Sequence, residues 1–386
     1  MSKLFIALIL IFSAFPALVF AQETVTPQQE LDPNLTPVEN FIHARVVEIL
    51  VDEQRNIAGS LVPYQQIIVE LLDGDEQGKH LTIEHLGSVV GESQKYKQGE
   101  RVLVTSIEYF GEIEYHIVDS YRVPSLIWIG AIFVGIVFLF ARFKGITALL
   151  GLTAGIIILA LYVVPKILEG GNPIFTSLVG AVIIAVLSLY LAHGISRQTT
   201  IALAGTLITL FLAVGFSWVF IKIANLNGLG SEEAFFLQLD PRLALNLKGL
   251  LLGGILIGAL GVLDDVTTAQ AAVVHELKKA NASFNFGQLY TRGLTVGREH
   301  IVSLVNTLAL AYIGASFPLF LYFALDNPQP LWVTFNSEFI AEEIIRTLVG
   351  STALVLAVPI TTALAAWHFG KQSSSAELKG STSGIL

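Results

Sequence analysis

Long apolar runs separated by short polar stretches dominate the chain after residue 124. Seven such runs lie at 125–141, 145–164, 174–193, 200–222, 246–264, 301–325 and 347–368. Each has about 17–25 residues, which is the length that an α-helix needs to cross roughly 30 Å of hydrocarbon. The pattern therefore predicts an all-α polytopic membrane domain of about seven transmembrane helices at 125–370. A disordered cytoplasmic tail is expected at 371–386.

Residues 41–124 have a different pattern, in which apolar and polar positions alternate. Ile67, Val69 and Leu71 form one apolar face, and Ile113, Tyr115 and Ile117 form another. This alternation predicts about five strands in roughly 80 residues, in a small β-rich barrel or sandwich for which an OB-like fold is one candidate. Two roles fit such a domain: a sensor or docking module, or a small domain that packs on the membrane part.

The N-terminus has the organisation of a secretory signal peptide at 1–21. Lys3 supplies a positive charge, an apolar run comes next, and Val19-Phe20-Ala21 fits the small-x-small cleavage pattern. An uncleaved membrane anchor fits the same residues, and both interpretations place the chain from residue 22 onward outside the cytoplasm. Residues 22–40, with three prolines, predict a polar linker.

Composition agrees with a membrane protein and limits its chemistry. Only 14% of residues are charged, against about 25% in soluble domains. Residues 22–124 hold 18 acidic and 7 basic residues, a net charge of −11, so a nucleic acid is not an expected partner. The expected partners are the lipid bilayer and a small solute or ion. The chain has no cysteine, which excludes disulfides and thiolate metal sites.

The charges of the loops predict the orientation of the helices. If residues 22–124 are extracytoplasmic and seven helices come after them, nine basic residues fall in inside loops and four in outside loops. Arg346 lies just before or within the last run. This asymmetry obeys the positive-inside rule and places the C-terminus in the cytoplasm.

The fifth apolar run contains two small-xxx-small pairs, Gly249/Gly253 and Gly254/Gly258. Such pairs let another helix approach to backbone contact, so tight structural packing is their plain interpretation. Gly151 and Gly155 repeat the spacing in the second run.

Asp264 and Asp265 end the fifth run and are followed by uncharged residues up to Val274. A charge at the centre of a bilayer costs roughly 2.5–3.5 kcal/mol. Three arrangements are therefore open: the aspartates lie at the cytoplasmic interface, one is protonated, or both line a wet cavity near a cation. Thr268 lies at i, i+4 from Asp264 and therefore shares its helix face. We expect the helix to bend near Asp265.

Polar residues also enter the sixth run. Glu299, Ser303 and Asn306 form one stripe beside Arg298, and the plain interpretation of Asn306 is an interhelical hydrogen bond. We place Arg298 and Asn306 nearest to Asp265.

The last apolar run has one notable feature before it and one within it. Glu342 and Arg346 before it are at i, i+4 and predict a local ion pair. Pro359 is expected to interrupt the run itself.

The motifs of common enzyme classes are missing from the sequence. It has no HExxH, no G-x-S-x-G and no P-loop, and it lacks the Gly-x-Gly-Asp and Tyr-Asp elements of intramembrane aspartyl proteases. We therefore expect no enzymatic activity and no cofactor. Whether a metal binds is left open.

Three stretches, in this order, resemble the YibE/F-like family of bacterial membrane proteins. They are Gly258–Val266, Gly297–Glu299 with Asn306–Gly314, and Glu343–Gly350. Ser231–Ala234 also fits, and the resemblance as a whole covers roughly 140–370. The resemblance implies a multi-span protein of the bacterial inner membrane and no particular activity. It aligns the family's carboxylate with Asp265, whereas Asp264 and the polar run Thr267–Gln270 depart from the family's pattern.

A transporter or permease for a small solute or ion fits these residues best, because acidic and polar groups on Gly-packed, Pro-interrupted helices are typical of transport sites. The candidate ion or substrate site comprises Asp265, Asp264, Thr268, Arg298, Asn306 and Glu299. The alternative is a non-transporting scaffold or sensor whose β domain binds a partner. A homo-oligomer or another membrane protein is compatible with both.

Overall fold

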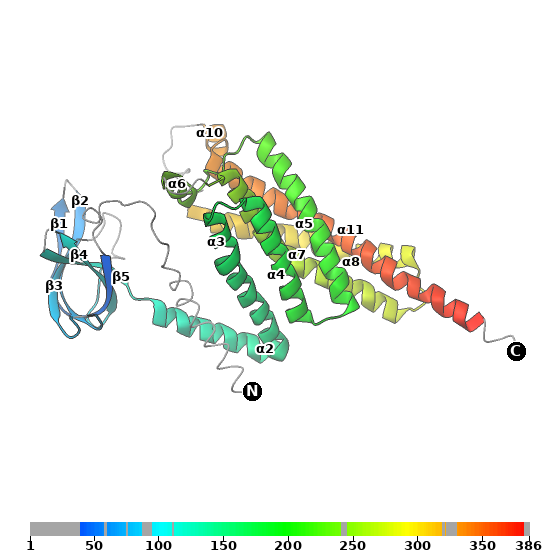
Figure 1. Cartoon of the computed structure of the whole chain (residues 1–386), viewed down its shortest axis with the longest axis horizontal. Coiled ribbons are helices and arrows are strands. Elements are labelled where there is room, and N and C mark those ends of the chain that lie inside the picture. The colour runs from blue at the N-terminus through cyan, green and yellow to red at the C-terminus, as the bar shows by residue number, and fades with distance from the viewer. Residues whose placement is uncertain are drawn as a thin grey trace. The chain divides into compact units, whose positions relative to one another are not determined.

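The computed structural model describes residues 39–57, 60–74, 76–86, 95–109, 112–240, 245–318, 321 and 330–381 (Figure 1). The chain divides into two compact units between Ile136 and Val137. The expected signal peptide at 1–21 and nearly all of the expected linker at 22–40 lie outside the described residues.

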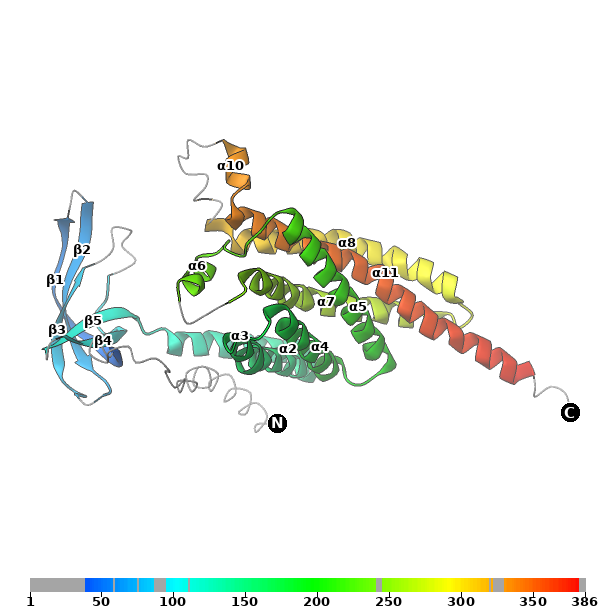
Figure 2. The same cartoon turned by 45° about the horizontal axis from the view of Figure 1, so that its top comes forward.

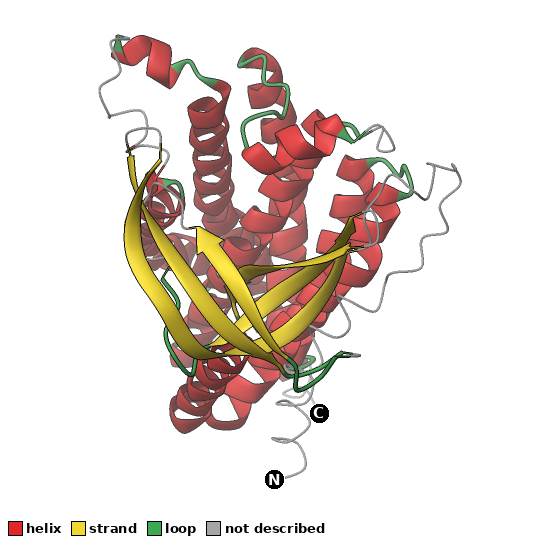
Figure 3. Cartoon of the chain, turned by 90° about the vertical axis from the view of Figure 1, so that its left-hand side faces the viewer, coloured by secondary structure: helices red, strands yellow, loops and turns green. Residues whose placement is uncertain are grey.

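The first unit contains an antiparallel sheet, which confirms the β-rich N-terminal part. Its strands are β1 (Glu39–Ile57), β2 (Ser60–Leu71), β3 (His80–Leu86), β4 (Arg101–Tyr109) and β5 (Glu112–Ser120). Their order is β3-β2-β1-β4-β5, and the two edge strands also contact each other, so the sheet is strongly curled (Figure 3). Tyr115 of β5 donates a 2.6 Å hydrogen bond to Glu76, which raises the pKa of Tyr115 to about 12.

Alternating side chains fill the inside of the curled sheet. Ile67, Val69 and Leu71 are buried on β2, while Ile68 and Glu70 between them are only partly covered. Since successive side chains of a strand point to opposite faces, the period-2 pattern of β2 places this part of the core. The predicted apolar face of β5 is met only in part, because Ile117 is buried while Ile113 is exposed.

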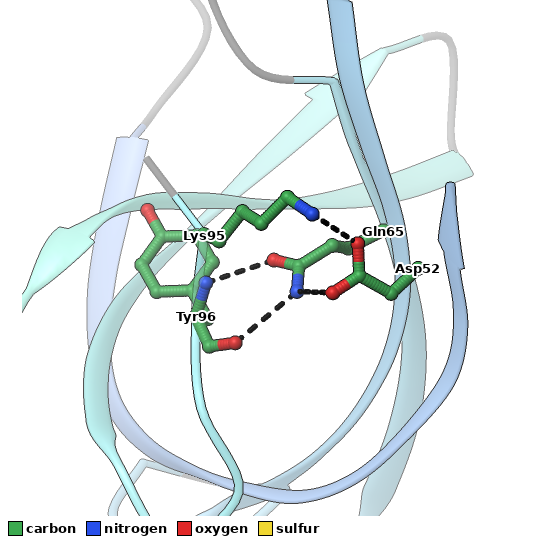
Figure 4. A network of polar contacts seen from close by, with 4 residues as sticks. All are labelled: Asp52, Gln65, Lys95 and Tyr96. Atoms are coloured by element: carbon green, nitrogen blue, oxygen red, sulfur yellow. Dashed lines mark hydrogen bonds and ion pairs between the residues drawn. The ribbon is translucent and has the colours of Figure 1, made fainter. Parts of the chain in front are cut away.

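One buried glutamine fastens the segment before β4 to the sheet (Figure 4). Gln65 is 1% exposed; its Oε1 accepts a hydrogen bond from the Tyr96 amide at 2.8 Å, and its Nε2 donates to the Tyr96 carbonyl at 3.2 Å. Asp52 accepts from Gln65 and also pairs with Lys95 at 2.6 Å. The network satisfies the polar atoms of an amide that would otherwise be costly to bury.

Helices make up most of the described residues after Tyr121 (Figure 2). They are α2 (Val123–Ile158), a π-helical turn (Leu159–Val163), α3 (Val164–Leu168), α4 (Pro173–His193), α5 (Arg197–Ile223), α6 (Glu232–Leu239), α7 (Leu247–Ala280), α8 (Phe286–Ala315), α10 (Leu331–Phe335) and α11 (Glu338–Ser381). Helix α7 is central, because it packs against α4, α5, α8 and α11.

Within the residues that the structure describes, five helical segments are long and apolar enough to cross a membrane: Val123–Leu168, Pro173–His193, Arg197–Ile223, Leu247–Ala280 and Glu338–Lys371. The predicted count of seven is not matched exactly. The two predicted runs 125–141 and 145–164 fall in one segment, whose helix is broken at Arg142 by a positive φ of 51°. The predicted run 301–325 overlaps α8, which is not among the five.

Two helices continue where the sequence predicted a bend or an interruption. Helix α7 runs as one helix from Leu247 to Ala280, so the expected bend near Asp265 is wrong. No glycine or proline occurs after Asp265 before Ala280, and packing against several neighbours supports the continuous helix. Helix α11 passes through Pro359 and beyond Lys371 to Ser381, into the segment expected to be a disordered tail.

Two carboxylates at the start of α11 bind backbone amides of the loop after α5. Glu338 Oε1 accepts hydrogen bonds from Asn227, from Gly228 at 2.9 Å and from Leu229, and Glu342 Oε1 accepts from Gly230 at 2.9 Å. We call these four amides and two carboxylates the amide clasp.

The predicted pair of Glu342 with Arg346 is wrong. Arg346 instead pairs with Glu343 at 3.0 Å, because the amide clasp draws Glu342, which is 4% exposed, toward the loop.

Candidate functional site

A cavity of about 360 Å³ lies beside the middle of α7 in the helical unit. Its walls come from the second half of α2, from α4 and from α7. The lining is mostly apolar, and its polar side chains are Ser188, His193, Asp264 and Asp265. Since α7 has 34 residues and begins at Leu247, the two aspartates lie near its midpoint.

The two aspartates have unequal surroundings. Asp264 is partly covered, and its Oδ1 is buried without a hydrogen-bond partner in the described part of the chain. The Ser188 hydroxyl interacts with the same carboxyl group. Asp265 lines the cavity as well but is exposed. No lysine or arginine is among the described residues that line the cavity, so an ionised pair would lack a fixed cation.

Glycines of α2 set the width of the cavity. A Cβ added at Gly151 would lie 3.2 Å from the Ser188 Cα atom, and one at Gly155 would lie 3.3 Å from Ile184. Helix α2 therefore approaches α4 to near backbone contact on this side, and Ser188 is held opposite Asp264.

The glycines of α7 differ in what they face. A Cβ at Gly253 would lie 2.3 Å from the Ser177 hydroxyl of α4, and one at Gly249 would lie 3.4 Å from Pro173. At Gly258 the nearest atom is the Tyr312 hydroxyl of α8, at 3.2 Å. The fourth glycine, Gly254, has open space around its added Cβ. The first small-xxx-small pair thus lies against α4, whereas the second lies on another face.

The other residues proposed for the site lie elsewhere. Thr268 donates a 2.8 Å hydrogen bond to the Asp264 carbonyl, a contact within its own helix. Arg298, Glu299 and Asn306 are exposed on α8, and none of them lines the cavity. The structure therefore brings Asp264 and Asp265 together but does not place the polar residues of α8 beside them.

Sequence reasoning missed Ser188 and His193 as lining residues and the position of Gln270. Gln270 is fully buried, and its Nε2 donates to the Gly293 carbonyl at 2.8 Å and to Thr362 at 2.7 Å, which links α7, α8 and α11. Serine in an apolar helix is too common to single out without knowing its neighbours. No cluster of three or more potential metal ligands occurs in the part of the chain that the structure describes.

Comparison with known proteins decides the family. A family model described as YibE/F-like protein matches residues 129–371, well over half of the 386 residues. The chain belongs to the YibE/F-like family. No curated protein and no solved structure matches it.

Every residue that lines the cavity, from Ala148 to Asp265, lies in the YibE/F-like match. The β sheet precedes the matched residues. Together with the apolar helices, the family shows that this is a membrane-embedded protein, as the resemblance implied. The acidic cavity thus belongs to the part of the chain that defines the family.

Proposed function

We propose that this YibE/F-like protein is a membrane transporter or permease for a small solute or ion, with a cation bound at Asp264 and Asp265. The single observation that carries the proposal is the buried, unpaired Oδ1 of Asp264 in the wall of the cavity. A buried carboxylate oxygen without a donor is costly unless it takes a proton or a cation.

The position of the pair supports transport rather than a surface role. Both aspartates lie near the middle of α7, one of the five helices long enough to cross a membrane. Acidic residues at membrane depth characteristically mark ion or proton pathways. The cavity volume of about 360 Å³ lies within the range of roughly 300–1,000 Å³ that is usual for small-molecule sites.

The test is a flux assay with the full chain in proteoliposomes. A pH-sensitive dye reports protons, and separate gradients of sodium, potassium and magnesium test each cation. We expect at least one gradient to produce flux above that of protein-free liposomes. If no gradient does so while the protein remains folded, transport of these four cations is excluded, and the scaffold or sensor alternative gains support.

We also propose that residues 22–124 are extracytoplasmic, that the C-terminus is cytoplasmic and that the membrane is the bacterial inner membrane. The nine inside and four outside loop charges, counted for seven crossings, support this orientation. A reporter that works only in the cytoplasm should be active when it is fused after Lys371. Activity there of a reporter that works only outside would contradict the orientation.

A further inference from the structure

An exposed row of residues runs along α8 with coiled-coil spacing. Its members are Val296, Glu299, Ser303, Asn306, Leu310 and Ile313, which are separated alternately by three and four residues. All six side chains are exposed; Leu310, for example, is 69% exposed. This 3.5-residue period is the spacing that keeps one face of a helix against a parallel partner helix. We call this row the α8 seam.

The α8 seam lies at the depth of a membrane-crossing helix. Helices α8 and α11 pack antiparallel, because Gly293 meets Thr362, Gly297 meets Val358, and Leu308 meets Gly350. The contacted part of α11 lies in the middle of Glu338–Lys371, a segment long and apolar enough to span a membrane. Asn306 is therefore level with the interior of that segment.

Lipid is a poor neighbour for this face. The first half of α2 exposes large apolar side chains, the kind that hydrocarbon favours, with Trp128, Ile129 and Phe133 each more than half exposed. The α8 seam instead exposes a carboxylate, a hydroxyl and an amide. The side chains of Glu299 and Asn306 make no hydrogen bond or ion pair with the residues that the structure describes. Unpaired polar groups are strongly disfavoured in hydrocarbon.

We propose that the α8 seam is the interface with a second copy of this chain, around a two-fold axis along the membrane normal. In such a pair each position meets the same position of the other copy. The side-chain amide of Asn306 has both a donor and an acceptor, so the Asn306 side chains of the two copies can hydrogen-bond each other. Glu299 likewise meets its own copy, where one carboxyl group that keeps its proton can donate a hydrogen bond to the other. The apolar Leu310 and Ile313 complete the contact.

The absence of cysteine from the chain makes the test direct. Single cysteines are introduced in the full-length protein in membranes, and disulfide formation is driven by a mild oxidant. Asn306→Cys should give a disulfide-linked dimer at a severalfold higher yield than Thr307→Cys. Thr307 is the matched control, because it is also exposed but turned about 100° around the helix. Ser303→Cys and Leu310→Cys should behave like Asn306→Cys.

A second measurement asks whether two differently tagged cysteine-free copies co-purify from one membrane. Co-purification together with a crosslinking maximum on the α8 seam supports the proposal. Failure to co-purify overturns it, as does equal crosslinking at positions 306 and 307. A crosslinked product containing another protein, or a monomer whose seam is covered by its own chain, would also overturn it. None of these readouts depends on transport.

Discussion

Replacing Asp264 by asparagine should reduce cation flux by about 10- to 100-fold while the helical bundle stays folded. The amide keeps the shape of the side chain but loses the charge. A hydrogen bond or contact that involves a charged group contributes roughly 1.5–3 kcal/mol, and each 1.4 kcal/mol corresponds to a factor of ten. The proteoliposome assay measures the flux, and thermal unfolding of the purified variant checks the fold.

The neighbouring aspartate provides the matched control. Asp265→Asn makes the same chemical change one residue away, at a side chain that is exposed. We expect a smaller loss of flux, because water competes with an exposed carboxylate for the cation. If both variants transport like the unmodified protein, the cavity is not the transport site. If only Asp265→Asn is inactive, the carboxylate aligned with the family pattern carries the function instead.

The sequence identified the aspartate pair but could not rank its members. Adjacent residues of a helix point about 100° apart, so which one enters the cavity depends on how α7 is rotated against α2 and α4. That rotation is set by close contacts such as Gly253 with Ser177, which join residues far apart in the chain. The sequence favoured Asp265, whereas the geometry favours Asp264.

Helix rotation, which the sequence does not reveal, also decides where the polar residues of α8 point. Their spacing correctly indicated one polar stripe, since Glu299, Ser303 and Asn306 are all exposed on α8. The sequence then placed Arg298 and Asn306 nearest to Asp265, because both lie at the start of the next apolar run. Instead, Gly293 and Gly297 face Gln270 of α7, and the stripe points away. The β sheet was easier to predict, because its alternation needs no knowledge of distant neighbours.

The amide clasp leads to the largest expected effect on stability. Gly228 has a φ of +85°, and its amide donates to Glu338. A Cβ at this position would lie 2.4 Å from the Leu247 carbonyl oxygen and 2.5 Å from the Leu247 carbonyl carbon. These are backbone atoms at the start of α7, so no side-chain rotation relieves the overlap.

Gly228→Ala should therefore lower the free energy of unfolding by about 2–5 kcal/mol. The left-handed conformation costs a non-glycine residue about 1–2 kcal/mol, and overpacking adds about 1–3 kcal/mol. Gly170→Ala is the matched control, because Gly170 has a φ of +88° with nothing within 4 Å of its added Cβ, so only the first cost applies. Thermal unfolding of both variants in detergent measures the difference. Equal losses would mean that Gly228 is required only for its backbone conformation and that the loop is not held tightly against α7 and the amide clasp.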